Sequence, residues 1–389
     1  MSKQTEIQWG EVAIAETDEW QQYHLGDVAD IQTGPFGSQL HSADYVAVGI
    51  PSIMPTNIGR RLEISKESIA CITEADAQRL SRYLVEAGDI VYSRRGDVEK
   101  CAFITEQENG WLCGTGCLRI RFTSEIIHPK FCAYYLSTDE MKGWISSHAV
   151  GTTMPNLNSG ILKRLPISLP SLSEQRAIVE VLSSLDDKID LLHRQNATLE
   201  ALAETLFRQW FVEEAKEEWE EGTLGDFFTL QRGFDLPIQN RVPGKFPILT
   251  SSGYSAGHNE FKIKGPGVTT GRSGVIGKVF FVMEDFWPLN TSLFIKEYKL
   301  GTPLFSYFTL KFADLEGFNA GSAVPTLNRN HVHAHISPIP PKDLINRFEE
   351  VAYPHFKKIY QNTNQIQTLS TLRDTLLPKL MSGEVRVAY

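Results

Sequence analysis

The second half of this chain repeats part of the first half. When residues 151–211 are laid over residues 321–381 without gaps, 15 of the 61 positions are identical, whereas average composition would give roughly four. Upstream, Leu25-Gly26-Asp27 resembles Leu224-Gly225-Asp226, and Gln32-Thr33-Gly34 resembles Gln231-Arg232-Gly233. A duplication of this kind dictates the fold, because each copy must form the same supersecondary unit.

The repeat organises the chain as a variable unit, a repeated unit, a second variable unit and a second repeated unit. The predicted bounds are 1–165, 166–216, 217–335 and 336–389. A length of 389 residues with 42% apolar residues suits two or three folded domains. The variable units combine short β-like runs with helical stretches at 129–147 and 303–316, which predicts mixed α/β domains within an α+β protein.

Each repeated unit begins with a proline-rich segment that favours extended backbone and continues as a long helix. In the first unit Ser171 and Glu174 have the spacing of a capping box. Apolar residues then follow in steps of four and three, interrupted only by Asn196: Ile178, Leu182, Leu185, Ile189, Leu192, Leu199, Ala203, Leu206 and Trp210. A helix over 173–212 would be about 60 Å long. Asn196 either fixes the register of a coiled coil or lies at the fringe of the stripe.

The second repeated unit has the same seam in a more irregular form, and Pro354 is expected to kink or restart its helix. Since each helix presents one apolar stripe, we expect the two to pair as an antiparallel coiled coil with a pseudo-two-fold relation between the variable units. The alternative is that each helix packs on the variable unit that precedes it.

Basic residues in glycine-containing hairpin segments recur in both variable units and are candidates for contact with a nucleic acid, because arginine suits phosphate or guanine and glycine permits close approach. They are Arg94, Arg95, Lys100, Arg272 and Lys278. The alternative is an ordinary hairpin turn with a solvated arginine. Small polar residues around a proline end each variable unit, and they are either weaker contact candidates or plain turn formers: Thr152, Thr153, Asn156, Asn158, Ser322, Thr326 and Asn328.

The remaining composition excludes several classes of protein. The sequence has no run of about 18 apolar residues and no leader with a basic start and an apolar stretch. Its five cysteines have no paired spacing. We therefore expect a cytoplasmic protein with reduced thiols. The glycine-rich segment 271–278 is followed by Val279 where a phosphate loop needs Ser or Thr. We expect no catalytic, metal or cofactor site in this chain.

Three stretches resemble the DNA-specificity subunits of type I restriction-modification systems: residues 169–178 (LPSLSEQRAI), 185–189 (LDDKI) and 376–385 (LLPKLMSGEV). The second repeated unit departs from this pattern, since residues 342–347 (KDLINR) stand where Ser-Glu-Gln-Arg is expected. The resemblance covers essentially the whole chain.

The resemblance implies two target-recognition domains, each recognising one half of a bipartite DNA site, with the coiled coil setting the spacer. It also implies two methyltransferase subunits docked on the helical regions, which carry S-adenosylmethionine and methylate adenine, and a motor-nuclease subunit that joins them. The chain itself would be non-catalytic and, at a net charge of −9, would bind DNA weakly alone. The alternatives are a fused enzyme with its own recognition domains and a coiled-coil assembly protein that binds other proteins.

Overall fold

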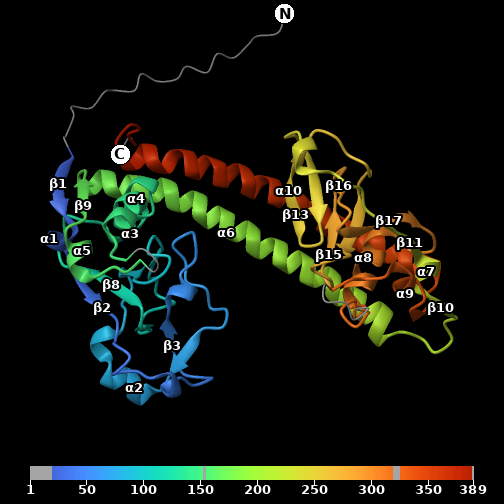
Figure 1. Ribbon diagram of the computed structural model, residues 1–389, viewed down its shortest axis with the longest axis horizontal. Coiled ribbons are helices and arrows are strands. Elements are labelled where there is room, and N and C mark those ends of the chain that lie inside the picture. The colour runs from blue at the N-terminus through green and yellow to red at the C-terminus, as the bar shows by residue number, and fades with distance from the viewer. Residues whose placement is uncertain (1–19, 152–154, 319–324, 388–389) are drawn as a thin grey trace, which may run out of the picture. The chain divides into compact units, whose positions relative to one another are not determined.

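The computed structural model describes residues 20–151, 155–318 and 325–387. The chain forms two compact units, of which unit 1 comprises residues 1–187 and 370–389 and unit 2 comprises residues 188–369. Two long helices, α6 (Leu172–Arg208) and α10 (Lys342–Met381), each contribute one segment to unit 1 and one to unit 2 (Figure 1). We call the sheets and short helices of unit 1 head 1, and those of unit 2 head 2.

Head 1 contains two small sheets and a two-stranded ribbon. The four-stranded antiparallel sheet has the order β2 (Ala29–Thr33), β8 (Cys117–Phe122), β5 (Ile90–Ser93) and β6 (Cys101–Phe103). The three-stranded sheet has the order β4 (Ala70–Ile72), β3 (Ile50–Ile53) and β7 (Leu112–Cys113), with β3 and β7 parallel. The ribbon pairs β1 (Gln21–His24) with β9 (Pro166–Leu169), and the helices are α1 (Leu25–Val28), α2 (Glu74–Arg79), α3 (Pro129–Leu136), α4 (Asp139–His148) and α5 (Ser159–Lys163).

Head 2 repeats this topology strand for strand. Its four-stranded sheet has the order β11 (Phe228–Arg232), β17 (Ser292–Tyr298), β14 (Gly267–Gly271) and β15 (Val279–Val282). Its three-stranded sheet has the order β13 (Gly253–His258), β12 (Phe246–Thr250) and β16 (Trp287–Pro288), again with one parallel pair. The ribbon is β10 (Glu221–Thr223) with β18 (Ile336–Pro338), and the helices are α7 (Leu224–Phe227), α8 (Pro303–Phe312) and α9 (Arg329–His333). The duplication inferred from sequence identities is therefore confirmed.

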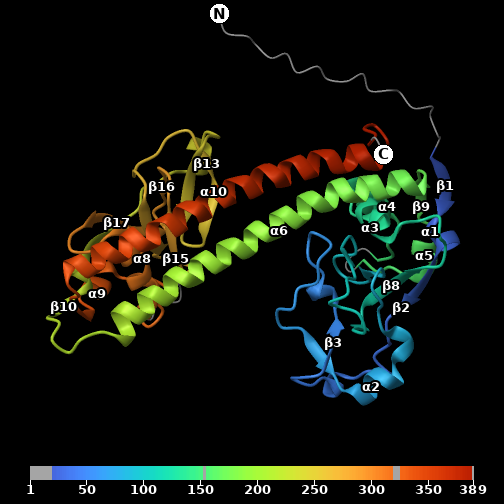
Figure 2. The same cartoon turned by 180° about the vertical axis from the view of Figure 1, so that it is seen from behind.

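The two long helices run antiparallel to each other within each unit, and Figures 1 and 2 show them side by side. In unit 1, Arg373 of α10 donates to Asp186 of α6 at 3.0 Å. In unit 2, Asn362 donates to Asn196 at 2.9 Å, and further along α6 the ring of Phe207 lies 5.6 Å from that of Phe348. Residues nearer the end of α6 contact residues nearer the start of α10. The predicted antiparallel pairing is therefore confirmed.

The ends of the helices also pack on the heads. The alternative arrangement, in which each helix packs on the variable unit that precedes it, is therefore correct in part. Ile178 and Leu182 of α6 and Leu380 of α10 belong to the core of head 1. Phe207 of α6 and Phe348 of α10 belong to the core of head 2. Every predicted seam residue of α6 is buried or half-buried. The amide of Glu174 donates to the Ser171 hydroxyl at 3.3 Å, which gives the predicted start of the helix.

The structure differs from the sequence predictions in the detail of two helices. Helix α10 runs from Lys342 to Met381 without ending at Pro354. Pro354 is exposed, so water can supply the hydrogen bond that the carbonyl of Glu350 loses to the proline ring. The predicted helical stretch 129–147 is two helices, because Thr138 caps α4 by accepting from the amide of Met141. All five cysteines are free and buried. Within the described ranges, every helix is too short or too polar to span a bilayer.

Candidate nucleic-acid interface

In head 1 an arginine-glycine loop, residues 94–96, leaves the end of β5 and pairs with the proline segment, residues 155–158. The amide of Gly96 donates to the carbonyl of Pro155 at 3.3 Å, and the amide of Leu157 donates to the carbonyl of Arg94 at 2.9 Å. Gly96 has a φ of +75°, which glycine adopts without the penalty that a side chain would bring. The sequence motifs around Arg94 and Asn156, which are far apart in the chain, therefore form one surface.

Head 2 builds the same loop with the same hydrogen bonds. The amide of Gly274, whose φ is +89°, donates to the carbonyl of Pro325 at 3.0 Å. The amide of Leu327 donates to the carbonyl of Arg272 at 2.8 Å. The two arginine-glycine loops are equivalent in backbone structure, which supports a common role and is more than two unrelated hairpin turns would show.

The equivalent arginines Arg94 and Arg272 are half-buried and hold their loops in place. The Arg94 guanidinium donates through Nε to the carbonyl of Leu157 at 3.2 Å, and the Arg272 guanidinium donates through Nη1 to the carbonyl of Asn290 at 3.3 Å. Burial, and to a smaller extent the neighbouring charge of Arg95, lower the pKa of Arg94. Part of the donor capacity of both side chains is thus committed inside the protein.

Arg95 is the exposed arginine of the first loop. In the described part of the chain its guanidinium has no hydrogen-bond or ion-pair partner, while its own carbonyl accepts from the hydroxyl of Ser93 at 3.2 Å. The ring of Phe36 is 53% exposed and lies 5.7 Å from the guanidinium carbon of the neighbouring Arg94. Head 1 therefore presents an exposed arginine, Arg95, and an exposed aromatic ring held against Arg94, two groups that suit base contact.

The two predicted lysines occupy equivalent places in their hairpins but lie beside the loops. The carbonyl of Lys100 accepts from the amide of Ser93 at 2.9 Å, and the carbonyl of Lys278 accepts from the amide of Gly271 at 3.4 Å. The Lys100 side chain forms an ion pair of 3.0 Å with Asp97. The Lys278 side chain is exposed.

Two of the predicted polar residues are helix caps. The Asn158 side chain accepts from the amide of Ile161 at 2.9 Å at the start of α5, and the Asn328 side chain accepts from the amide of Asn330 at 3.0 Å at the start of α9. Asn156 and Thr326 are half-buried and form isolated bridges with Arg95 and Ser273. The candidates Thr152, Thr153 and Ser322 lie outside the described residues.

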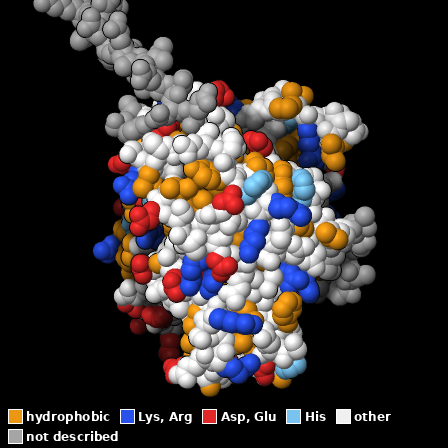
Figure 3. Space-filling view, turned by 90° about the vertical axis from the view of Figure 1, so that its left-hand side faces the viewer, with side chains coloured by type: hydrophobic (Ala, Val, Ile, Leu, Met, Phe, Trp, Pro, Cys, Tyr) orange, Lys and Arg blue, Asp and Glu red, His pale blue; other side chains and the backbone are white. Residues whose placement is uncertain are grey.

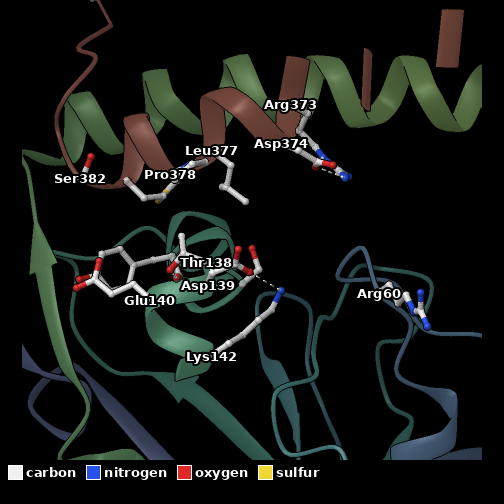
Figure 4. A pocket seen from close by; sticks show the side chains of 13 residues that line it. Arg60, Thr138, Asp139, Glu140, Lys142, Arg373, Asp374, Leu377, Pro378 and Ser382 are labelled. Carbon is white, nitrogen blue, oxygen red and sulfur yellow. Dashed lines mark hydrogen bonds and ion pairs between the residues drawn. The ribbon is translucent and has the colours of Figure 1, made fainter. Parts of the chain in front are cut away.

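A cavity of about 420 Å³ lies in unit 1 between the start of α4 and the last turns of α10 (Figure 4). Its lining combines both charges, with Arg60, Lys142 and Arg373 against Asp139, Glu140 and Asp374. An adjoining hollow of about 210 Å³ shares Arg60 and Lys142 and contains Lys100. Three basic and three acidic side chains line the cavity, so it has no field of a single sign that would select an anion or a cation.

On the face shown in Figure 3, Lys and Arg lie singly or in small groups between uncharged side chains. Phe36 in head 1, and Asp235 with Asn290 in head 2, were not among the residues predicted from the sequence to contact DNA. Phe36 and Asp235 follow the repeated glycines Gly34 and Gly233 by two residues, so the repeat itself was the signal that could have found them.

The fold and this surface define a class of protein: two copies of one mixed α/β head, each built together with segments of two antiparallel helices. The chain belongs to the family described as the type I restriction modification DNA specificity domain, whose model matches residues 17–201 and 216–366. The resemblance drawn from the sequence motifs is thereby confirmed.

Similar proteins carry the same description. The specificity subunit of the type I restriction enzyme MjaIX from Methanocaldococcus jannaschii is 24% identical, with 97% of each chain covered. The specificity subunit of the type I restriction enzyme HindI from Haemophilus influenzae is 25% identical over 59% of this chain and 48% of its own length. The crystal structure of the type I restriction-modification S subunit from M. genitalium matches with a TM-score of 0.67 at 18% identity, covering 95% of this chain and 98% of that one, and shows a shared fold.

Proposed function

We propose that this chain is the sequence-specific DNA-binding specificity subunit of a type I restriction-modification complex. Residues 1–165 and 217–335 are the two target-recognition domains, each recognising one half of a bipartite site, and residues 166–216 and 336–389 are the helical spacer regions. The observation that carries the proposal is the arginine-glycine loop built twice, with the same backbone hydrogen bonds and different exposed side chains. Equivalent loops with unlike surfaces suit two unlike half-sites on one duplex.

Base contact in this proposal comes mainly from the exposed residues of each loop. Arg95 is available for a base edge, while Arg94 and Arg272 position the loops through their carbonyl contacts. Lys100 and Lys278, beside the loops, suit phosphate contact. Asn156 and Thr326 lie on the paired segments, whereas Asn158 and Asn328 fix the adjoining helices as caps.

The long helices offer a docking surface that occurs twice. Six residues on one side of α6 are exposed and identical to exposed residues at the equivalent positions of α10: Glu180 and Gln195, which match Glu350 and Gln365, and four further residues. We call these four and their counterparts the outer stripe: Lys188, Thr198, Leu202 and Thr205 on α6, and Lys358, Thr368, Leu372 and Thr375 on α10. The four threonine hydroxyls donate to carbonyls one turn back at 2.8–3.0 Å, which leaves less polar surface for a partner to desolvate.

Identity between the helices is not confined to the residues that pack between them. Some buried positions differ between the repeats, as in Leu182 and Ala352 or Leu192 and Asn362, although Ile189 and Ile359 are the same, and the outer stripe is the same throughout. A surface kept in both copies while the core changes suits one partner bound twice. We therefore assign the outer stripe to two methyltransferase subunits, one on each repeat.

The chemistry in this proposal belongs to those partners. They carry S-adenosylmethionine and methylate adenine, a motor-nuclease subunit can join the complex, and this chain is non-catalytic. A net charge of −9 makes the isolated chain a weak DNA binder, since the partners supply much of the phosphate neutralisation. The proposed location of the complex is the cytoplasm.

The test is to map methylated adenines in a genome that carries this system and to repeat the mapping after the gene for this chain is deleted. We expect one bipartite, asymmetric motif that disappears on deletion. A gel shift of the assembled complex should favour a duplex with that motif over a random duplex. Methylation by the purified chain alone would identify a fused enzyme instead. Equal binding of both duplexes would indicate instead a coiled-coil assembly protein that binds other proteins.

A further inference from the structure

Near the arginine-glycine loops, the two heads differ in the residue that follows a repeated glycine by two positions. The amide of Gly34 donates to the carbonyl of Cys117 at 2.9 Å, and the amide of the equivalent Gly233 donates to the carbonyl of Ser292 at 3.0 Å. Two residues later, head 1 has the exposed ring of Phe36, and head 2 has the carboxylate of Asp235. Because both residues leave the same anchor, they sit at matching places in the two heads.

In head 2 the basic groups around this position are already engaged. Arg272 donates to the carbonyl of Asn290, and the Asn290 side-chain amide donates to Oδ1 of Asp235. Arg232 forms an ion pair of 3.4 Å with the same oxygen. A chain of contacts thus runs from the arginine-glycine loop to Asp235 and fixes the orientation of its carboxylate.

The second oxygen of Asp235 is available. The Asp235 side chain is 67% exposed, and both of its contacts use Oδ1. Among the residues that the structure describes, Oδ2 accepts no hydrogen bond. The loop position that is Arg95 in head 1 is Ser273 in head 2. The exposed tip of head 1 therefore offers hydrogen-bond donors, whereas that of head 2 offers an oriented acceptor.

We propose that Asp235 is a specificity-determining residue of head 2 that accepts a hydrogen bond from the N4 amino group of a cytosine in the major groove, while Arg95, on the arginine-glycine loop of head 1, contacts guanine. This inference rests on the proposed function. Carboxylates accept from cytosine N4, and arginine donates to guanine O6 and N7, so the two heads recognise opposite hydrogen-bond patterns.

A carboxylate on a DNA-binding surface weakens contact with phosphates, and a hydrogen bond to a base can offset that loss. Asp235 repels phosphates, so it lowers the affinity for every duplex by a similar factor. Opposite a cytosine amino group it gains a hydrogen bond, and opposite the carbonyl of guanine or thymine it meets an acceptor. The result is discrimination against the wrong base as well as attraction to the right one.

The experiment selects duplexes from a randomised pool with the complete complex of this chain and its methyltransferase subunits. Asp235→Asn keeps the size of the side chain and its hydrogen bond to Asn290 but removes the charge. We expect the wild type to enrich a bipartite site with a cytosine at one position of one half. The variant should lose that preference by about tenfold, and the other half should be unchanged. Glu297→Gln, an exposed residue near the far end of β17, is the charge-matched control and should leave both halves intact.

The unchanged half-site reports that the variant is folded and assembled. If Asp235→Asn keeps the same preference, or raises the binding of all duplexes equally, Asp235 is only a surface charge and the inference is wrong. If the wild-type complex enriches no sequence, the proposed function itself fails, so the two failures are distinguishable. An Arg95→Ala complex should lose a guanine preference in the opposite half-site only.

Discussion

Asn362 of α10 has no exposed surface and donates through Nδ2 to Oδ1 of Asn196 on α6 at 2.9 Å. The same nitrogen donates to Oε1 of Gln195 at 2.9 Å, and Nδ2 of Asn196 donates to the Thr363 hydroxyl at 3.4 Å. Asn196 is therefore part of a polar contact between the helices and does more than border the apolar stripe. A polar layer of this kind restricts the register of a helix pair and lowers its stability.

Replacing Asn362 by leucine should stabilise unit 2. Its repeat counterpart is Leu192, which is buried in the same helix pair, and Oδ1 of Asn362 is buried without a hydrogen-bond partner among the described residues. Removing that unsatisfied oxygen should raise the free energy of unfolding by about 1 kcal/mol, measured by urea unfolding. Asn362→Ala is the control and should be destabilising, because it leaves a cavity. A leucine variant as unstable as the alanine variant would show that the amide contacts outweigh the cost.

Acid should weaken head 2 through His333. A bulge between Thr229 and Leu230 interrupts the ladder of β11, and the amide of Leu230 donates to Nε2 of His333 at 2.8 Å. Burial, and then Lys299 and Arg329, lower the pKa of His333 below its ordinary 6.5. Below pH 6.5 the unfolded chain binds the proton more readily than the folded chain, so stability is lost as the pH falls from about 6.5 through the lowered folded value.

The comparison variant is His333→Gln, which keeps an acceptor but does not titrate. We expect thermal unfolding midpoints of the wild type and the variant to diverge as the pH is lowered from 7.5 to 5, with the wild type losing more. Parallel curves would mean that His333 does not couple protonation to folding.

Backbone architecture was largely predictable from the sequence because the repeat and the heptad seam are patterns of many residues. The seam from Ile178 to Trp210 gave the helix, its buried face and its partner. Pro354 misled the prediction because a single proline breaks a helix only where its lost hydrogen bond cannot be replaced, and this one faces solvent. The effect of a proline on a helix therefore depends on how far its position is buried, and sequence alone does not show burial.

The candidate site was predictable as a place but not as a set of roles. Glycine spacing located the loops around Arg94 and Arg272, but which guanidinium is committed depends on the carbonyls of Leu157 and Asn290, residues distant in the chain. Likewise Asn158 is suited to both DNA contact and capping, and only the position of α5 decides that it caps. Side-chain roles depend on tertiary neighbours that no local pattern encodes.

Charge placed on the outer stripe should remove partner subunits one at a time. Leu202 and Leu372 are 49% and 45% exposed at equivalent positions of α6 and α10. Leu202→Glu or Leu372→Glu should each leave a complex with one methyltransferase subunit, and the double variant should leave none, because burying an unpaired carboxylate is costly. Light scattering of the purified complexes gives the stoichiometry.

Ala197→Glu is the control for these variants. Ala197 is exposed on α6, differs from its repeat counterpart Gln367, and points about 140° around the helix from Leu202, away from the outer stripe. It should retain two methyltransferase subunits. Loss of partners in all three single variants alike would mean that any charge on these helices disrupts assembly, and the outer stripe would have no special role.

Exchange of a whole head should change half of the recognised site. Residues 1–165 can be replaced by the corresponding segment of a family member with a different methylation motif. The junction falls before β9, whose pairing with β1 is made by backbone hydrogen bonds that do not depend on side chains. Methylation mapping should then give one new half-site, one unchanged half-site and the same spacer, since α6 and α10 are untouched. A motif altered in both halves, or a changed spacer, would show that the heads do not recognise DNA independently of each other.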